Sequence, residues 1–424
     1  MLGRRFVGAR RHDEAGLPDP IRLQFFEYHA VEYRAQEVSQ DLASVTSLGL
    51  SLELSTSRPR PEAMATLSTI IVTHDSREAV QRTLPALAGQ LRDGDELIVV
   101  DNASGDGTPE VVSELAPDAV VIETGSNLGF GGACNRGAEA AAGELLCFLN
   151  PDAAPAEGFR DAIELPLADD RGWAAWQGLV TADGGRTVNT RGGVIHYTGI
   201  AWAGGAGEQL GTDDAGERPE PGFVSGACLA IPRTAFLDHG GFADDFFLYH
   251  EDVDLSLRVR LAGGRLGVEP RARVDHEYEF SKGAAKWRQL ERNRWATVIR
   301  TYPAALLAPL VPGLLATELA LVVIAATGGW LPQKLAAWAD TLGSLPRLMQ
   351  ERGEIQARRT IGALDFARGL TADLDSPYLG ATGRSGALRT LLRGYWSAVV
   401  ALLGSPGLAR SSSGTPFDRS SRNS

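Results

Sequence analysis

The chain has 424 residues, of which 44% are hydrophobic and 22% are charged, and its formal net charge is −12. This length and apolar content exclude a disordered chain, a coiled coil and a small disulfide-stabilised protein, and they predict two or three domains. The acidic balance argues against binding to nucleic-acid backbones, so we expect no nucleic-acid partner. The three cysteines, Cys134, Cys147 and Cys228, cannot form a disulfide framework and lack zinc-site spacing, which favours a reducing, cytosolic setting.

Residues 1–63 differ in composition from the rest of the chain. They carry mixed charge and no long periodic apolar segment, and the residues near Met1 lack the apolar run of a secretory signal. We expect them to be a poorly ordered N-terminal extension or the product of an upstream start codon.

From about Leu67 onward, strands and helices are predicted to alternate. Short runs of β-branched and apolar residues predict strands, and the segments between them predict helices. The predicted strands cover residues 68–73, 96–100, 119–123 and 144–149, and the predicted helices cover residues 78–91, 108–115 and 132–142. This alternation predicts an α/β fold with a mixed, mainly parallel sheet flanked by helices, which binds ligands at the carboxyl ends of its strands.

The pattern weakens after this region and changes again near Tyr302. Further predicted elements are a strand at 223–231, a helix at 254–261, a short strand at 266–269 and apolar segments at 304–327 and 395–403. The tail from residue 411 is rich in serine and is expected to be disordered. We therefore divide the chain into residues 1–63, an α/β domain at 64–302, a helical region at 303–410 and a tail at 411–424.

Polar or glycine-rich segments follow each of the first four predicted strands. They are residues 73–76, 101–104, 126–132 and 150–153. Taken singly, each has an ordinary interpretation as a turn, a helix cap or a tight glycine loop. Together they converge on one crevice at the carboxyl ends of the strands, where glycines let a ligand approach the backbone.

This set of segments resembles the inverting glycosyltransferases of family 2, and in particular their rhamnosyltransferase-like branch. The matching segments are residues 73–76 (THDS), 99–108 (VVDNASGDGT), 127–131 (NLGFG), 135–137 (NRG), 149–153 (LNPDA) and 246–255 (FFLYHEDVDL). The resemblance implies a GT-A fold for residues 64–302 and a nucleotide-sugar donor. It favours L-rhamnose transfer from dTDP-L-rhamnose to a lipid-linked or polysaccharide acceptor in cell-envelope glycan synthesis, with UDP-sugars as less favoured donors.

The resemblance also implies roles for individual residues in the donor site. Asp101 would hold the base or ribose of the nucleotide, and Asp75 would help to frame the base pocket. The other positions expected to bind the donor are Thr73, His74, Asn102, Asn127, Gly129, Asn135 and Arg136.

A divalent cation, Mg²⁺ or Mn²⁺, is the cofactor that the resemblance implies. Asp152 occupies the place of the last acid in the D-x-D metal motif of the family, where its carboxylate would bind an ion bridging the two phosphates. Asn150 replaces the first acid of that motif, which leaves fewer ligands. His276 matches a position that supplies a further metal or phosphate contact, although a single histidine after a strand is otherwise an ordinary surface residue.

The catalytic pair implied by the resemblance is Glu251 and Asp252. An inverting transfer is a single displacement that needs one carboxylate to take the proton from the acceptor hydroxyl, and Asp252 is the candidate base. In a purely structural interpretation, Glu251, Asp252 and Asp254 only begin the predicted helix, where acids interact favourably with the helix dipole. The two interpretations are compatible.

The apolar segment at 304–327 raises the question of membrane contact. Pro309, Pro312 and Glu318 argue against a helix that spans the bilayer. The segment before it is basic, with Lys282, Lys286, Arg288, Arg292, Arg294 and Arg300 against the single acid Glu291. We therefore expect peripheral attachment to the anionic cytoplasmic face of the cell membrane, with helices packed on the sheet as the alternative. The sequence leaves the oligomeric state open.

Two other functions were weighed against sugar transfer. A sugar-phosphate nucleotidyltransferase needs a Gly-rich loop with Arg or Lys directly after the first strand, where this chain has THDS at residues 73–76. A non-catalytic, membrane-bound sugar-binding scaffold is disfavoured because both Asp152 and Asp252 are present.

Overall fold

The computed structural model describes residues 65–211, 219–276, 285–375 and 385–405, all of which belong to the unit Arg60–Ser424. The expectations for residues 1–63 and for the tail from residue 411 lie outside the described residues. The boundary expected at residue 302 stays a prediction.

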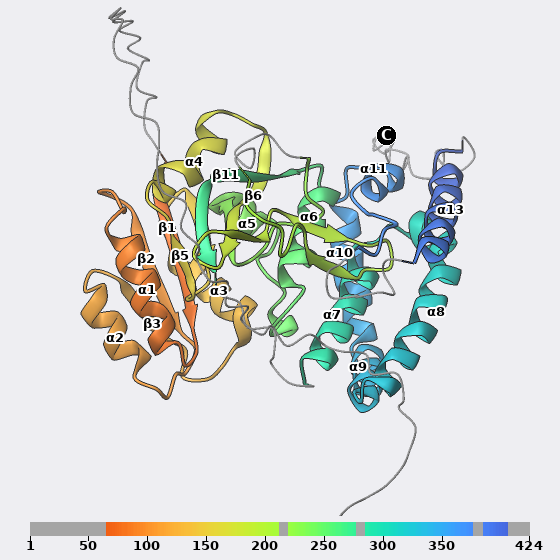
Figure 1. Ribbon diagram of the computed structural model, residues 1–424, viewed down its shortest axis with the longest axis horizontal. Helices are drawn as coiled ribbons and strands as arrows, with labels where there is room; N and C mark the ends of the chain where they lie inside the picture. Colours follow the sequence, from red (N-terminus) through yellow and green to blue (C-terminus); the bar gives the residue numbers. More distant parts are fainter. Residues whose placement is uncertain (1–64, 212–218, 277–284, 376–384, 406–424) are drawn as a thin grey trace, which may run out of the picture. The chain divides into compact units, whose positions relative to one another are not determined.

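A nine-stranded sheet runs through the described part of the chain, and its first four strands are parallel (Figure 1). These strands are β1 (Leu67–Thr73), β2 (Glu96–Asp101), β3 (Val120–Glu123) and β4 (Leu145–Leu149), arranged in the order β3-β2-β1-β4. β1, at the middle of this group, is buried along its whole length. Its polar end residue, Thr73, is in register with Asp101, the last residue of β2, so the two strand ends meet.

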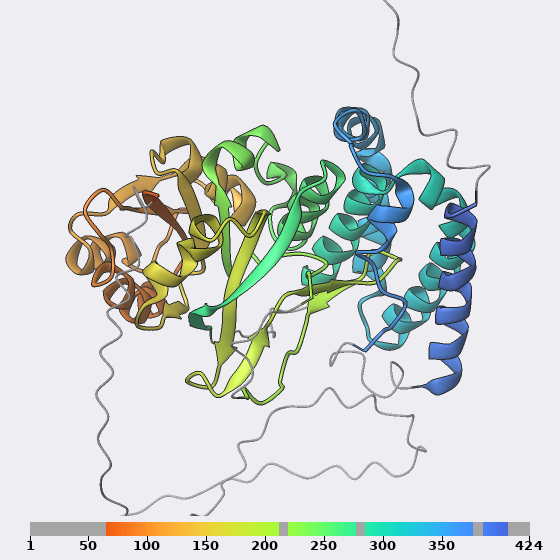
Figure 2. The ribbon, with the colours of Figure 1, turned by 90° about the horizontal axis from the view of Figure 1, so that it is seen from above.

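The second half of the sheet is mixed. β10 (Cys228–Pro232) is antiparallel to both β4 and β6 (Trp173–Ala182). β11 (Arg265–His276) is parallel to β6, beside which it runs in Figure 2, and antiparallel to β5 (Ala153–Pro155). β7 (Thr187–Thr190) pairs with β6, and β8 (Gly193–Ile195) pairs with β9 (Ala201–Ala203) in a separate two-stranded sheet. The expected mixed sheet is confirmed, and its purely parallel part is the group β3-β2-β1-β4.

Helices cover both faces of the sheet, as the alternating pattern predicts. Alternate residues of β1, Ile71 and Ile70, point into two separate cores. The Ile71 core is closed by α1 (Arg77–Ala88), α2 (Thr108–Leu115) and α4 (Phe159–Ala168). The Ile70 core is closed by α3 (Gly129–Ala140), α5 (Arg233–Asp238) and α6 (Glu251–Leu261).

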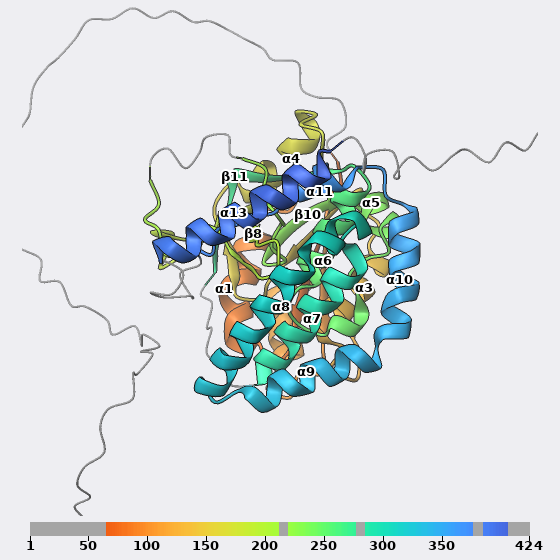
Figure 3. The same ribbon diagram turned by 90° about the vertical axis from the view of Figure 1, so that its right-hand side faces the viewer.

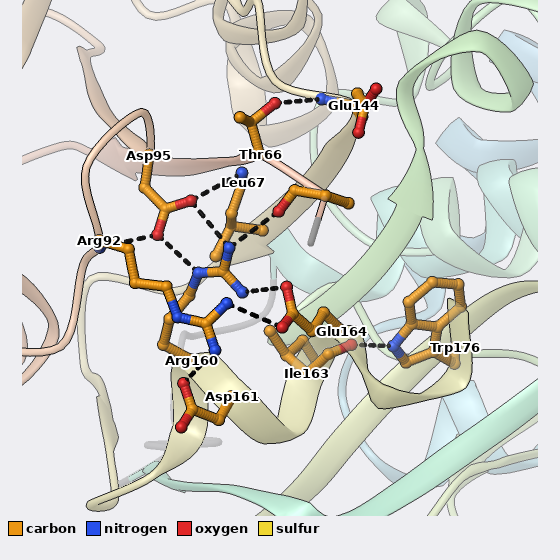
Figure 4. A network of polar contacts seen from close by, with 11 residues as sticks. Thr66, Leu67, Arg92, Asp95, Glu144, Arg160, Asp161, Ile163, Glu164 and Trp176 are labelled. Carbon is orange, nitrogen blue, oxygen red and sulfur yellow. Dashed lines mark hydrogen bonds and ion pairs between the residues drawn. The ribbon is translucent and has the colours of Figure 1, made fainter. Parts of the chain in front are cut away.

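The ends of the parallel strands opposite to the predicted crevice are fixed by a buried ion network (Figure 4). Arg160 of α4 donates from Nε to Oδ2 of Asp95 (2.6 Å), and Asp95 Oδ1 accepts from the backbone N–H of Leu67, where β1 begins (2.9 Å). The same guanidinium forms an ion pair with Glu164, with 2.6 Å between Arg160 Nη1 and Glu164 Oε2. This network stabilises the fold far from the carboxyl ends of the strands.

The structure describes six helices after residue 284, and all of them except Leu331–Gly343 contribute to a third core that includes residues of α6. The six helices are α7 (Ala285–Thr301), α8 (Ala304–Thr327), α9 (Leu331–Gly343), α10 (Leu345–Ala357), α11 (Ala363–Ala367) and α13 (Gly386–Leu403). One side of α8 enters this core with Leu306, Leu310 and Leu314, beside Leu257 of α6. Figure 3 shows α8 and α13 on the side of the molecule that faces the viewer.

The acid in the middle of the apolar helix α8 is paired with buried cations. Glu318 forms an ion pair with Arg294 of α7 and lies 2.7 Å, Oε2 to Nζ, from Lys334 of α9. Both cations also pair with Glu291 of α7. Burial opposes the ionisation of Glu291, but the charges of Arg294 and Lys334 outweigh it and lower its pKa to about 2.

This charge cluster corrects the expectation of a basic stripe facing a membrane. Arg294 is buried in the cluster, and Arg300 is buried against Asp254 of α6. Arg288 pairs with Asp340, and Arg292 donates to the backbone carbonyls of Asp245 and Phe246. Lys282 lies outside the described residues. The arginines of α7 therefore hold helices and loops together.

Candidate active site

The ends of β1 and β2 are joined through Asp101. Its buried carboxylate accepts hydrogen bonds from Thr73 Oγ1 (3.0 Å) and Ser104 Oγ (2.6 Å) on Oδ1, and from the Ser104 N–H (3.0 Å) on Oδ2. A carboxylate accepts about four hydrogen bonds, so Asp101 shapes the loop and can still accept one from a ligand.

His74 and Asp75 lie exposed in the loop that follows β1. Nδ1 of His74 is 2.9 Å from the carbonyl oxygen of Asn102, and Oδ1 of Asp75 accepts the N–H of Gly105 at 2.7 Å. The loops after β1 and β2 therefore form one continuous polar surface, in which both predicted residues are accessible to a ligand.

Asn102 connects this surface to the start of α3. Its Nδ2 donates to Asn127 Oδ1 and to the carbonyl of Gly129, both at 3.0 Å, and its Oδ1 accepts the N–H of Leu128 at 2.8 Å. The side chain is buried and its donors bind the protein, so Asn102 holds this loop, and its expected role in donor binding stays a prediction.

Gly129 brings the backbone of this loop against the segment that precedes Glu251. Its φ is +77°, and a Cβ atom placed there would lie 2.3 Å from the carbonyl oxygen of Phe247. The neighbouring N–H of Phe130 donates to that same oxygen at 2.6 Å. Only glycine meets both requirements, so the predicted donor loop and the predicted catalytic segment are in direct contact.

Asn135 and Arg136 are not joined to these residues by any described hydrogen bond or ion pair. The amide of Asn135 exchanges two hydrogen bonds with the backbone of Phe242, each 2.9 Å long. Arg136 is exposed and pairs with Glu139 along α3. Their expected roles in donor binding stay predictions.

The two predicted metal ligands lie next to each other. His276, the last residue of β11, is in register with Ala153 of β5, which places its Nε2 3.1 Å from Asp152 Oδ1 and 3.2 Å from the side-chain nitrogen of Asn150. Within the described ranges no group of three or more His, Cys, Asp or Glu side chains could hold a metal ion. One carboxylate fits a divalent ion that takes its remaining ligands from water and phosphate oxygens, as Mg²⁺ does. The imidazole is a nitrogen ligand, which Mg²⁺ does not favour.

Arg82 of α1 also reaches this position, and the sequence patterns did not indicate it. Its Nη2 donates to the carbonyl of Asp152 at 2.8 Å, and its Nη1 lies 3.3 Å from Oδ2 of Asp275. A single arginine within an amphipathic helix resembles any surface residue, so only the folded structure shows that it faces the end of β4.

Glu251 and Asp252 begin α6 in two different environments. Glu251 is buried, its Oε2 has no hydrogen-bond partner among the described residues, and burial together with the Asp252 charge raises its pKa to about 8. Asp252 is half-buried, and its oxygens accept the N–H groups of Gly226 (3.0 Å) and Val253 (2.8 Å). Burial raises the pKa of Asp252, and these donors oppose the rise.

A short backbone path connects Asp252 to the predicted metal ligands. Gly226, which binds Asp252, precedes Ala227, whose carbonyl accepts the N–H of Asn150 at 3.1 Å. Asn150 in turn approaches His276. Because β10 is antiparallel to β4, the start of β10 meets the carboxyl end of β4. The candidate base and the candidate metal pair therefore lie at the same edge of the sheet.

Comparisons with known proteins identify the family of this chain. Residues 68–198 match the family model described as glycosyl transferase family 2. The chain is 31% identical over 243 residues to an N-acetylglucosaminyl-diphospho-decaprenol L-rhamnosyltransferase of Mycobacterium tuberculosis, an alignment that covers 51% of this chain and 78% of that protein. It is 26% identical over 250 residues to a pre-mycofactocin glycosyltransferase of the same species, covering 57% of this chain and 48% of that protein.

Solved structures of similar proteins include a mannosyltransferase from Pyrobaculum calidifontis in complex with GDP-Man and Mn²⁺. It is 20% identical to this chain with a TM-score of 0.40, over 82% of this chain and 87% of that one.

Proposed function

The chain belongs to glycosyltransferase family 2 and uses a nucleotide-sugar donor, and we propose that it transfers L-rhamnose, with inversion, from dTDP-L-rhamnose to a lipid-linked acceptor in cell-envelope glycan synthesis. The observation that carries this proposal is the half-buried Asp252 carboxylate, bound by the Gly226 N–H at the sheet edge that also holds Asp152 and His276. The choice of sugar and acceptor is supported by the printed name of the mycobacterial relative.

The proposed reaction is one displacement at the anomeric carbon. The acceptor hydroxyl oxygen forms a bond to that carbon on the face opposite to the nucleotide diphosphate, while the bond from the carbon to the diphosphate oxygen breaks. Asp252 takes the hydroxyl proton, and the electron pair of the broken bond leaves with the diphosphate. The sugar is transferred with inverted configuration.

Glu251 supports the ionised form of its neighbour by remaining protonated. Two adjacent carboxyl groups in a buried site do not both ionise readily, and the more deeply buried one keeps its proton. The raised pKa of Glu251, about 8, fits that role. Asp252, which accepts two backbone N–H groups, is then the group that carries the negative charge near neutral pH.

Asp152 and His276 are proposed to hold the divalent cation, with the amide of Asn150 beside them. When bound, the cation supplies positive charge against the departing diphosphate. The guanidinium of Arg82 contacts the carbonyl of Asp152 and therefore fixes the loop that carries this ligand. Asp101, Asp75 and His74 are proposed to receive the nucleoside at the ends of β1 and β2.

The outer side of α8 supports attachment to a membrane surface. This helix is long and apolar enough to cross a bilayer by length and composition alone. Its exposed side carries large apolar residues at intervals of four, which form one stripe along the helix: Val311, Leu315, Leu319 and Val323. The opposite side is joined to the protein by the ion pair between Glu318 and Arg294.

A hydrogen bond from α13 also holds α8 against the protein. The Tyr395 hydroxyl donates to the Pro309 carbonyl (2.6 Å) and accepts the N–H of Gly313 (3.1 Å), inside the continuous helix. α13 carries Arg389 and Arg393 and no acid, and Arg393 forms an ion pair with Asp373 (2.7 Å). We propose that α8 lies in the plane of a membrane surface, because spanning the membrane would break the Glu318 and Tyr395 contacts.

Transfer assays with the full-length protein test the proposed function. The protein is incubated with dTDP-, UDP- and GDP-sugars, Mn²⁺ and an N-acetylglucosaminyl diphosphate carried on a polyprenol, and the anomeric configuration of the product is read by NMR. We expect rhamnose transfer from dTDP-L-rhamnose with inversion. Tighter calorimetric binding of UDP than of dTDP contradicts the donor, and retained configuration contradicts the mechanism. Donor binding without transfer to any acceptor favours the scaffold.

A further inference from the structure

The segment that leads into the catalytic pair has an unusual backbone. Between the short helix η2 (Asp244–Phe246) and α6, three residues that are not glycine have positive φ: Phe247 (+61°), Tyr249 (+72°) and His250 (+67°). Side chains with a Cβ atom are disfavoured in this region, so such a conformation persists only where the surroundings enforce it. The residues that follow directly are Glu251 and Asp252.

Asn293, on α7, is the side chain that holds this segment. It is fully buried, and its Nδ2 donates to the carbonyl oxygens of Phe246 (2.9 Å), Leu248 (2.9 Å) and Tyr249 (2.7 Å). Two amide hydrogens therefore serve three carbonyls, one of them shared. Since carbonyl oxygens can only accept, the nitrogen of the amide must face the segment.

The orientation and position of Asn293 are themselves fixed. Nε of Arg292 donates to Asn293 Oδ1 at 2.9 Å, which leaves the nitrogen directed at the carbonyls. Arg292 adds hydrogen bonds of 2.8 Å from Nη2 to the carbonyls of Asp245 and Phe246. On the other side, Arg294 is bound in the buried cluster with Glu291 and Glu318, so α7 offers a rigid support.

We infer that Asn293 is a positioning residue, whose amide sets the backbone conformation of residues 246–250 and thereby places the Asp252 carboxylate against the acceptor hydroxyl. The same segment receives the N–H of Phe130 on the carbonyl of Phe247, so its conformation also fixes the distance between the donor loop and the base. The inference rests on the proposed function, because it requires Asp252 to be the base.

Replacing the amide by a carboxylate of the same shape gives the sharpest test. Asn293→Asp keeps the volume but turns an acceptor toward three carbonyl oxygens, which repel it. A displacement of the base by about 1 Å costs on the order of 100-fold in rate, so we expect kcat to fall about 10- to 100-fold. The donor Kd, measured by calorimetry, should change less than kcat, because Asp101, Asp75 and His74 lie at the ends of β1 and β2 and only the loop at Gly129 contacts the displaced segment.

Gln356→Ala is the matched control. Gln356 of α10 likewise donates to a backbone carbonyl, that of Thr301 (2.8 Å), but at the C-terminal end of α7, away from Asn293. The control should lower the Tm while leaving kcat unchanged. If Asn293→Asp does not fold, Asn293→Ser and Asn293→Ala take its place, and the serine, which keeps one donor, should have the higher kcat.

The outcomes separate the inference from the proposed function. Wild-type kcat in folded Asn293→Asp, or equal kcat in the serine and alanine variants, overturns the positioning role. A decrease in kcat that is fully accounted for by the fraction of unfolded protein overturns it as well. Asp252→Asn is assayed in parallel. If Asp252→Asn retains turnover, the assignment of Asp252 as the base fails, whatever the Asn293 variants do. If Asp252→Asn loses turnover while Asn293→Asp keeps the wild-type kcat, only the positioning role is overturned.

Discussion

The imidazole Nε2 of His276 lies 3.1 Å from Oδ1 of Asp152, although one residue ends β11 and the other follows β4. The antiparallel pairing of β5 with β11 produces this contact, because it sets Ala153 opposite His276. Asn150, which replaces an acid in the family motif, places its amide nitrogen 3.2 Å from the same imidazole nitrogen. One carboxylate, one imidazole and one amide therefore lie together at this position.

Removing either member of this pair should weaken the response to divalent cations. We expect Asp152→Ala and His276→Ala to raise the half-saturating Mn²⁺ concentration for transfer by at least about 10-fold, since loss of a metal-site contact commonly costs 10- to 100-fold in affinity. Calorimetric titration of Mn²⁺ in the presence of nucleotide gives a second measurement. Asp169→Ala, at an exposed ion pair with Arg171, is the control and should match the wild type. Full activity after exhaustive chelation contradicts a metal requirement.

The buried carboxyl of Glu251 should make stability depend on pH. Its pKa is raised from 4.5 to about 8 in the folded state, so between those values the unfolded chain loses the proton while the folded chain keeps it. Stability therefore falls as pH rises through this window, by at most about 1.4 kcal/mol per pH unit. In urea unfolding at pH 5, 6, 7 and 8, Glu251→Gln should remove this slope.

Glu114→Gln, at an exposed position on α2, is the control for Glu251→Gln and should leave the profile unchanged. A wild-type profile in Glu251→Gln would show that the buried carboxyl ionises normally.

Gly129 offers a test of the contact between the donor loop and the catalytic segment. Gly129→Ala combines an unfavourable φ of +77° with a Cβ atom 2.3 Å from the Phe247 carbonyl. We expect the positive φ to lower the free energy of unfolding by about 1 kcal/mol and the close contact to lower it by about 1–3 kcal/mol. Gly158→Ala is matched, because Gly158 has φ +79° and nothing within 4 Å of a Cβ atom. Equal destabilisation of the two variants would mean that the loop at Gly129 and the segment at Phe247 can move apart without loss of stability.

The exposed stripe of α8 should determine binding to vesicles. Leu315, Leu319 and Val323 are 61%, 71% and 62% exposed, so replacing them with serine should leave the Tm close to the wild type. Each large apolar side chain gains about 1.5–3 kcal/mol on leaving water, so the triple variant should lose at least about 100-fold in partitioning to anionic vesicles. The control is Leu167→Ser with Leu237→Ser, two exposed leucines on α4 and α5. Unchanged sedimentation of the triple variant contradicts attachment through α8.

Much of the parallel part of the fold could be predicted because its signals are local. The helix at 108–115 is found at those residues, and the polar ends of β1 and β2 meet as expected. The helix predicted at 132–142 spans Gly129–Ala140 instead, and its first turn is rich in glycine, which a sequence pattern does not assign to a helix. The strand predicted at 266–269 continues to His276 because an irregularity between Glu269 and Arg273 accommodates Pro270.

The parts of the site that escaped prediction depend on contacts between distant segments. Asn293 is a polar residue on a helix, and nothing local shows that it reaches three carbonyls before Asp252. In the sequence, Glu318 argued against a membrane-spanning helix and Arg294 was counted as part of a basic segment facing a membrane. The structure shows that the two residues form an ion pair between α8 and α7. Such partners are fixed by tertiary packing, which the periodicity of a single segment does not encode.

The central claim is that Asp252 removes the proton from the acceptor, and the turnover of Asp252→Asn measures it most directly. The amide keeps the shape of the side chain but cannot act as a base, so transfer should fall at least about 100-fold while the Tm and donor Kd stay close to the wild type. Glu251→Gln, assayed beside it at pH 7, should retain most of its turnover because Glu251 is already protonated there. Near-normal turnover of folded Asp252→Asn would contradict the account.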